Sequence, residues 1–540
     1  MRRRHLSILL VVLAASLPAQ VELPALFSNG MVLQQGQEIP VWGWATAGTK
    51  ATVSFGGASV TATTPASGKW MLRLPTMATS SDGKSMIVNV GDESRTIDDV
   101  LVGEVWLCSG QSNMDFTLGG LSRKTRDPQH QPLADYVANE VKTASDPLLR
   151  QIAVPRTAST SEALTNFKGS WITCNPEKNS QFTGTGYFFA RELRRELNIP
   201  IGLIKCPWGG TLVEPWIPPS GFQNDPDMKA FYEEQHAAVA ERLAKWDPDK
   251  AKANFEERLT KWKADVVKAK ADKKRPPRRP RMPAPPDQSR TTSSALFNAM
   301  IHPLIPYGVK GAIWYQGESN RRQHAREYSL YFTQLIRGWR DLWGQGAFPF
   351  YFCQLAQYQA PPETPVDEDP WVHVCDQQRR TLALENTGMA VLNDIGEAKD
   401  IHPRNKMDAG KRLALWALAK DYARPLKAWS GPLYKEHRTE GSKIVVIFDH
   451  VGSGLMVGHK PLMDPAKPAE EPLKRFQICG EDRQWKWAQA KITGTDTVEV
   501  RHDEIPAPVA VRYAWAANAE GANLYNREGL PASLFRTDEW

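Results

Sequence analysis

A serine lies where a short apolar run meets a glycine-containing turn. The run 105–108 (VWLC) stops at the segment 109–114 (SGQSNM). Its length and the glycine after it predict a buried strand. A strand that ends in a tight turn can hold the side chain of Ser112 above the edge of a sheet, which is where a serine nucleophile is needed. Serine is also common in turns, so the assignment requires a base and oxyanion donors elsewhere in the chain.

His402 is the candidate base. It lies in the segment 393–403 (NDIGEAKDIHP), between a predicted strand and a predicted helix. Asp400 is close enough to hold one ring nitrogen of His402 and to leave the other for Ser112. A cap of the following helix is the alternative interpretation of this pair. The other candidates for the acid are Asp394, Glu397 and Glu318, or a Ser–His dyad whose imidazole is held by a backbone carbonyl.

An acyl-transfer site also needs donors for the developing oxyanion. We expect them from the backbone N–H groups of Ser112 and of Gly209 or Gly210, and from the side-chain amide of Gln316. These residues follow predicted strands, and the carboxyl ends of parallel strands share one edge of a sheet. Arg321, with Arg322 and Arg326, either binds a sugar carboxylate or forms a solvated helix face. The residues expected to contact substrate are Gln111, Asn113, Glu318, Asn320 and Arg321.

Four segments in this order resemble the sialate O-acetylesterase family of SGNH-type hydrolases: 110–114 (GQSNM), 208–211 (WGGT), 314–320 (WYQGESN) and 400–403 (DIHP). The ending 523–526 (NLYN) with 529–531 (GLP) is also similar. The resemblance implies a flavodoxin-like catalytic core without a metal or other cofactor. It also implies that Ser112 and His402 are nucleophile and base, and that O-acetyl groups are removed from sugars. Many SGNH enzymes carry the acid three residues before the histidine, where this chain has Lys399, so the acid stays open.

The resemblance does not select one acetylated substrate. Sialic acid, xylan and other decorated polysaccharides all fit, and an acetyl xylan esterase is an alternative within the same chemistry. A non-catalytic carbohydrate-binding protein on an inactive hydrolase core is the alternative from another class. A metal-dependent hydrolase lacks support, because the chain has no HExxH motif and no clustered His and Cys spacing.

The elements that would position these residues alternate between strand and helix from 101 to 425. This alternation predicts an α/β domain with a parallel sheet covered on both faces. The predicted strands after 105–108 are 201–206, 309–315, 348–355 and 389–393. The predicted helices are 187–197, 294–304, 328–343, 377–385 and 406–422.

Short runs in which apolar and polar residues alternate flank this domain on both sides. Residues 20–100 predict a β-sandwich-like domain with strands at 38–44, 50–55, 69–74 and 85–90. Residues 426–540 predict a C-terminal β region with strands at 443–449, 484–491, 497–501 and 509–515.

The catalytic domain contains an insertion at about 222–290. Apolar residues at helical spacing predict a hairpin of two helices, and a basic, proline-rich segment (273–286) follows it. The insertion is either a solvated excursion without function, or a lid, an oligomer contact or an anchor to an acidic polymer.

Composition places this chain among folded proteins with several domains. It has 540 residues, of which 41% are hydrophobic and 24% charged. Residues 1–19 combine three arginines with a short apolar stretch and a small-residue zone, which predicts a signal peptide and export. No other stretch approaches membrane-spanning length.

The net charge of +7 resides mainly in residues 2–4 and 273–281, so we expect a sugar partner and no nucleic acid. Six widely spaced cysteines exclude a zinc ribbon and leave open whether they form disulfides.

Overall fold

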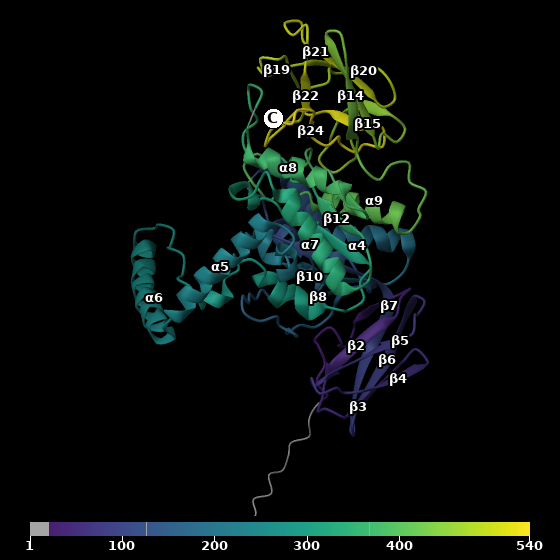
Figure 1. Cartoon of the computed structure of the whole chain (residues 1–540), viewed down its shortest axis with the longest axis vertical. Coiled ribbons are helices and arrows are strands. Elements are labelled where there is room, and N and C mark those ends of the chain that lie inside the picture. Colours follow the sequence, from purple (N-terminus) through teal and green to yellow (C-terminus); the bar gives the residue numbers. More distant parts are fainter. Residues whose placement is uncertain (1–20, 126, 367) are drawn as a thin grey trace, which may run out of the picture.

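The computed structural model describes residues 21–125, 127–366 and 368–540. The predicted signal peptide, residues 1–19, lies outside these ranges. Figure 1 shows three parts along the long axis: the first strands at one end, an α/β part in the middle, and the last strands at the other end.

The first part is built from strands whose inward-facing residues alternate with exposed ones. In β3 and β5, every second residue is buried, as a half-buried strand requires. Trp42 and Trp70 lie in its core. The last strand, β7, continues from this part into the central sheet, so it crosses the expected boundary at 100. The strands are β1 (Val32–Gln34), β2 (Ile39–Trp44), β3 (Lys50–Phe55), β4 (Ala58–Thr63), β5 (Lys69–Leu74), β6 (Ser80–Val90) and β7 (Glu93–Gly110).

The middle part has one mostly parallel sheet at its centre. Its strand order is β13-β12-β11-β7-β10-β8-β9, and every pairing except that of β8 with β9 is parallel. Counted along the chain from β7 and without β8 and β9, the remaining five strands have the order 2-1-3-4-5. The strands that follow β7 are β8 (Asp146–Ala153), β9 (Ile172–Cys174), β10 (Ile201–Pro207), β11 (Gly311–Tyr315), β12 (Phe350–Cys353) and β13 (Thr387–Ala390).

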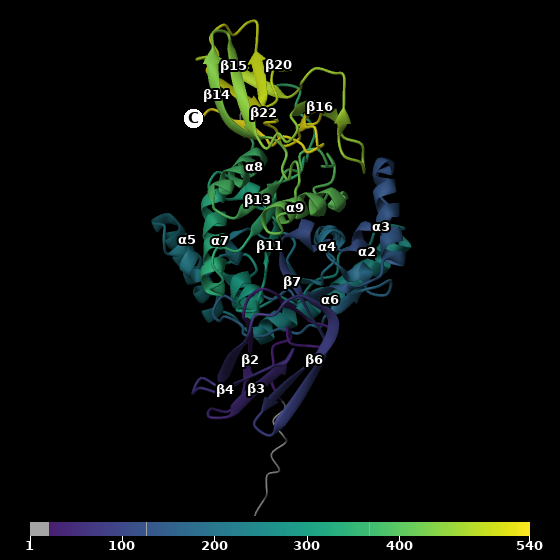
Figure 2. The same ribbon diagram turned by 90° about the vertical axis from the view of Figure 1, so that its right-hand side faces the viewer.

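Helices cover both faces of this sheet (Figure 2). In β12, Phe350 and Phe352 contact Phe332 of α7, whereas Tyr351 between them stacks on Trp416 of α9. Successive side chains of a strand point to opposite faces, so α7 and α9 lie on opposite sides. The helices are α1 (Ser112–Asp115), α2 (Leu118–Leu121), α3 (Gln131–Thr143), α4 (Gly184–Leu197), α7 (Tyr328–Trp343), α8 (Pro370–Arg380) and α9 (Lys406–Lys420).

Two predicted helices are wrong in type or position. The helix expected at 294–304 is a π-helical turn, Phe297–Ile301, followed by a 3₁₀ turn, His302–Leu304. The helix expected at 377–385 is α8, which begins earlier because Asp369 caps it and Pro370 occupies its first turn. The predicted helix 328–343 agrees with α7, and the helical hairpin in the insertion is present as α5 (Pro226–Ala244) and α6 (Pro248–Ala271).

The last part consists of several small antiparallel sheets. It contacts the middle part through polar bonds, such as that from Gln354 Nε2 to Ser533 Oγ at 2.9 Å. Its strands are β14 (Leu433–Glu440), β15 (Lys443–Asp449), β16 (Leu455–His459), β17 (Lys467–Pro468), β18 (Phe476–Cys479), β19 (Lys486–Trp487), β20 (Gln489–Ile492), β21 (Thr497–Arg501), β22 (Ala510–Tyr513), β23 (Leu524–Asn526) and β24 (Phe535–Arg536). All six cysteines are buried free thiols.

Candidate active site

Ser112 is held at the junction of β7 and α1. β7 ends at Gly110, whose φ is +128°, and a Cβ there would lie 2.3 Å from the carbonyl oxygen of Tyr315. Only glycine fits this close approach to β11. The chain therefore turns sharply after the strand, and Ser112 begins the short helix α1 at the carboxyl edge of the sheet.

His402 reaches Ser112 from the loop between β13 and α9. Its Nε2 lies 2.9 Å from Ser112 Oγ, which is hydrogen-bonding distance. The Phe116 ring packs against the imidazole with ring centroids 4.9 Å apart. The serine and the histidine are 290 residues apart in sequence, and the sheet brings them together in the arrangement of a nucleophile and its base.

Asp400 is the acid nearest to His402. One of its carboxylate oxygens, Oδ1, accepts the backbone N–H of His402 at 2.9 Å and lies 3.3 Å from His402 Nδ1. Hydrogen bonding from His402 is the main cause that lowers the pKa of Asp400. The Asp400 side chain is 51% exposed, so this pair is more accessible to solvent than a buried Asp–His pair.

The rival acids are engaged with other partners. Asp394 forms a buried two-point ion pair with Arg412, at 2.6 and 2.8 Å. Glu397 accepts the backbone N–H of Arg404 at 2.7 Å. Neither is bonded to His402, so Asp400 is the carboxylate that the geometry favours.

Three backbone amides beside Ser112 are free to hold an oxyanion. Among the described residues, the N–H groups of Ser112, Gly209 and Gly210 have no hydrogen-bond acceptor. A Cβ on Gly209 would lie 3.3 Å from Ser112 Cβ, so the glycine lets this loop approach the serine closely. These amides therefore stay the candidate donors for an oxyanion.

Gln316 does not point into the site. Its Nε2 donates to the carbonyl oxygen of Thr211 at 3.1 Å and to Asn320 Oδ1 at 2.7 Å, and its Oε1 accepts from the Tyr328 hydroxyl. The side chain is fully buried. The expectation that Gln316 donates to the oxyanion is therefore wrong, because both amide hydrogens are used to join the loops after β10 and β11.

Asn320 and Asn113 are structural as well, so the expectation that they contact substrate is wrong. Asn320 is fully buried and bonds to Glu214 and to the backbone N–H of Val213. Asn113 is 1% exposed and its amide holds the loop that carries His402. Sequence position beside the site residues did not reveal that both side chains face inward.

A buried lysine completes this support. Asn113 Nδ2 donates to the carbonyl oxygen of Ile401, and Lys406 Nζ donates to that of Pro403 and to Asn113 Oδ1. The two carbonyls on either side of His402 are thus held by the neighbour of Ser112 and by the first residue of α9. Burial lowers the pKa of Lys406 to about 8. The sequence did not single out Lys406, because a lysine at the start of a helix usually faces solvent.

A pocket of about 660 Å³ opens in front of Ser112 and His402. Glu318 lines it with a carboxylate that is 4% exposed; Oε1 accepts from Asn113, and Oε2 has no partner within the described ranges. Burial raises the pKa of Glu318. Arg321 also lines the pocket, over the rings of Tyr358 and Trp371. The other lining residues are Gln111, Gly210, Leu212, Ser319, Arg322, Gln323 and Ile401.

In the part of the chain that the structure describes, no group of three or more His, Cys, Asp or Glu side chains is arranged to hold a metal ion. No helix there has the length and apolar character needed to cross a membrane.

Comparison with known proteins places this geometry in a family. Residues 102–253 and 291–419 match the family described as carbohydrate esterase, sialic acid-specific acetylesterase. The sialate O-acetylesterase of Mus musculus is 29% identical over 527 residues, covering 90% of this chain and 88% of the mouse protein. That of Homo sapiens is 26% identical over 531 residues, covering 90% and 86%. The crystal structure of a carbohydrate acetylesterase from Xanthomonas citri covers 96% of this chain and 100% of its own, with 34% identity and a TM-score of 0.76.

Proposed function

This chain belongs to the family of carbohydrate esterases described as sialic acid-specific acetylesterases, and from this premise we propose that it removes O-acetyl groups from sugars through an acetyl-serine intermediate on Ser112. It is an ester hydrolase by family. The core is proposed to be the flavodoxin-like fold of the SGNH hydrolases, and the strand order 2-1-3-4-5 supports this.

In the first half-reaction, His402 Nε2 takes the proton of Ser112 Oγ as Oγ attacks the acetyl carbonyl carbon. Asp400 holds the Nδ1–H of the imidazole and stabilises the imidazolium that forms. The negative charge on the carbonyl oxygen is met by the amides of Ser112 and of Gly209 or Gly210. The bond between the acetyl carbon and the sugar oxygen then breaks, and His402 gives its proton to that oxygen, which leaves as the sugar hydroxyl.

In the second half-reaction, water replaces the sugar. His402 takes a proton from the water, the resulting hydroxide attacks the acetyl carbon, and Ser112 Oγ leaves with the proton from His402. Acetate is released and the serine is regenerated. The observation that carries this proposal is the 2.9 Å contact between Ser112 Oγ and His402 Nε2, beside amides that have no other acceptor within the described residues.

Replacing the nucleophile tests the mechanism. Ser112→Ala should lower the rate of acetate release by roughly 10⁵- to 10⁶-fold, because no covalent intermediate can form. Acetate is measured enzymatically with an acetylated sugar as substrate, and circular dichroism checks the fold. A fluorophosphonate should label the wild-type protein and leave Ser112→Ala unlabelled. This difference would identify the nucleophile directly. A folded Ser112→Ala protein with wild-type activity would refute the assignment.

Arg321 offers a way to learn which sugar is bound. Neither Arg321 nor Arg322 has a carboxylate partner among the described residues, although both line the pocket. If the substrate is O-acetylated sialic acid, Arg321→Gln should raise KM for it by about tenfold, the loss of one charge-assisted hydrogen bond. KM for a neutral acetylated sugar should change less than twofold. Equal rises for both sugars would mean that Arg321 acts only by packing on Tyr358 and Trp371.

Export is proposed from the sequence of residues 1–19. Amino-terminal sequencing of the protein from the producing cell tests it: cleavage close to residue 19 is expected, and an intact Met1 on protein inside the cell would contradict it.

A further inference from the structure

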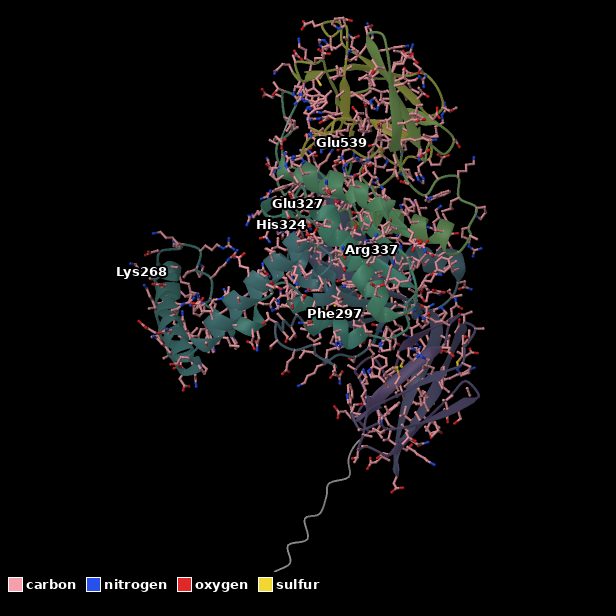
Figure 3. All side chains as sticks on the ribbon, viewed as in Figure 1. Lys268, Phe297, His324, Glu327, Arg337 and Glu539 are labelled. Atoms are coloured by element: carbon pink, nitrogen blue, oxygen red, sulfur yellow. The ribbon has the colours of Figure 1, made fainter. Side chains whose placement is uncertain are left out.

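A helical hairpin, followed by a basic segment, projects from the body of the molecule. α5 leads outward and α6 lies at its far end, well separated from the sheet (Figure 1). In the side-chain view, Lys268 on α6 is far from His324 and Arg337 on the body (Figure 3). The family match leaves residues 254–290 uncovered, so most of α6 and the segment after it are additions to the common core.

The outer helix α6 and the segment after it carry an excess of positive charge. Residues 247–281 contain thirteen Lys and Arg but six Asp and Glu, an excess of seven that equals the formal net charge of the whole chain. Within the described ranges, only Lys274 of these thirteen has an ion-pair partner, Asp272 at 3.7 Å. Unpaired like charges at this density repel one another, and a polyanion would relieve that repulsion.

The structure of α6 and of the segment after it leaves their Lys and Arg side chains accessible to a binding partner. Trp262 of α6 donates its indole N–H to the carbonyl oxygen of Pro277 at 2.9 Å, and the Arg279 guanidinium lies over the Trp262 ring. This contact ties the basic segment 273–281 to the helix. Six prolines between 276 and 286 restrict its backbone, which lowers the entropy lost when it binds a partner. Apart from Ala251, no residue of α6 is buried.

The root of the hairpin is fixed at the active site. Arg290, at the end of the returning segment, donates to the carbonyl oxygen of Gly209 at 2.8 Å and lies near the Trp208 ring. Phe231 of α5 packs on His324. The nineteen residues of α5 span about 28 Å, so α6 is held several sugar units away from Ser112.

We propose that residues 247–281 bind an anionic polysaccharide, the polymer whose acetyl esters the active site hydrolyses. That the bound polymer is also the substrate rests on the proposed function. Lysine and arginine bind carboxylate and sulfate groups alike, so the shared chemistry is a chain of sugars with repeated negative charges. Nucleic acid is disfavoured, because the ring of Trp262 is already occupied by Arg279 and by the basic segment instead of being free to stack on bases.

The test uses the full chain with four arginines replaced: Arg275→Gln, Arg278→Gln, Arg279→Gln and Arg281→Gln together. The matched control removes four exposed charges elsewhere: Lys84→Gln, Lys168→Gln, Lys178→Gln and Lys491→Gln. Affinity electrophoresis measures binding to polygalacturonate, dextran sulfate, neutral dextran and duplex DNA over a range of salt concentrations.

The arginine variant should bind the polyanionic glycans at least tenfold more weakly than the control, with a smaller dependence on salt. Loss on polygalacturonate alone indicates carboxylate recognition, and loss on dextran sulfate alone indicates sulfate recognition. Equal retention of variant and control on both glycans, or tighter binding of the wild type to duplex DNA than to either glycan, would overturn the proposal. The kcat/KM for a small acetylated sugar should stay within twofold in both variants. If the wild type hydrolysed no acetylated sugar, the proposed function would be refuted, whereas the measured binding to glycans would still stand.

Discussion

At the scale of residues, the site separates into groups that face the substrate and groups that hold them. Ser112, His402, Gln111, Glu318 and Arg321 border the pocket. The meeting of Ser112 and His402 was predictable only from several signals together, because a serine or a histidine in a turn is common by itself. Both follow predicted strands of one sheet, and four ordered segments resemble one family. The directions of the amides of Gln316, Asn113 and Asn320 were not predictable. An amide points toward whichever partners the fold supplies, and those partners lie far away in sequence.

The role of Asp400 as the acid beside His402 can be tested by single substitutions. Asp400→Asn should lower kcat by roughly 10²- to 10³-fold, because the imidazolium loses its counter-charge while the half-exposed position limits the effect. Asp394→Asn is the control with the same change of charge and shape. It should lower stability by about 3 kcal/mol, since Arg412 stays buried without its ion pair, but leave kcat of the folded protein within about threefold. Acetate release and thermal melts measure both variants; a large loss of kcat in Asp394→Asn alone would reassign the acid.

At the scale of elements, the fold was predictable where periodicity is strong. The strand 50–55 and the helix 328–343 agree with β3 and α7 because the spacing of their apolar residues is unambiguous. The prediction at 377–385 failed because the capping of α8 by Asp369 outweighed the apolar pattern further along. β7 crosses from one group of strands to another, and its pairing partners change at Gly103 and Glu104. The apolar residues on both sides of this point did not show that a single strand continues through it.

The start of α9 has a pH dependence that follows from its buried lysine. The pKa of Lys406 is about 8 in the folded chain and about 10.5 when it is unfolded. Below pH 8 both states hold the proton. Between pH 8 and 10.5 only the unfolded chain does, so this residue makes folding more favourable as pH rises.

Lys406→Met removes this titration. Compared with the variant, the wild type should gain up to about 3 kcal/mol of stability between pH 8 and 10.5. Urea unfolding of both proteins, followed by tryptophan fluorescence at pH 7, 8, 9 and 10, measures the difference. A difference that does not change with pH would show that Lys406 keeps an ordinary pKa. The variant should also lose kcat with little change in KM, because the carbonyl of Pro403 is no longer held.

At the scale of the whole molecule, the C-terminal β region contacts the start of α9, next to the loop that carries His402. The amide Nδ2 of Asn405 donates to the carbonyl oxygen of Leu462 at 3.2 Å, and Lys460 Nζ lies 2.8 Å from Asp408 Oδ2. Asp408 belongs to the first turn of α9, which follows the loop of His402 directly. Burial would raise the pKa of Asp408, but the charges of Arg412 and Lys460 outweigh it and hold that pKa below its usual value. The C-terminal region therefore contributes a charge to the packing behind the base.

Lys460→Met tests whether this contact between the two regions matters for catalysis. The substitution keeps the length of the side chain but removes its charge, so among the described residues Asp408 keeps the charge of Arg412 and the amide of Asn405 nearby. We expect a loss of up to about 3 kcal/mol in stability and a fall of about tenfold in kcat, because a displaced loop weakens the contact between His402 and Ser112. Lys467→Met, which removes a largely exposed charge from the same region, is the control and should change neither value appreciably. Thermal melts and acetate release at 25 °C measure the two effects. Unchanged kcat in a destabilised Lys460→Met protein would mean that the C-terminal region supports the fold without positioning the base.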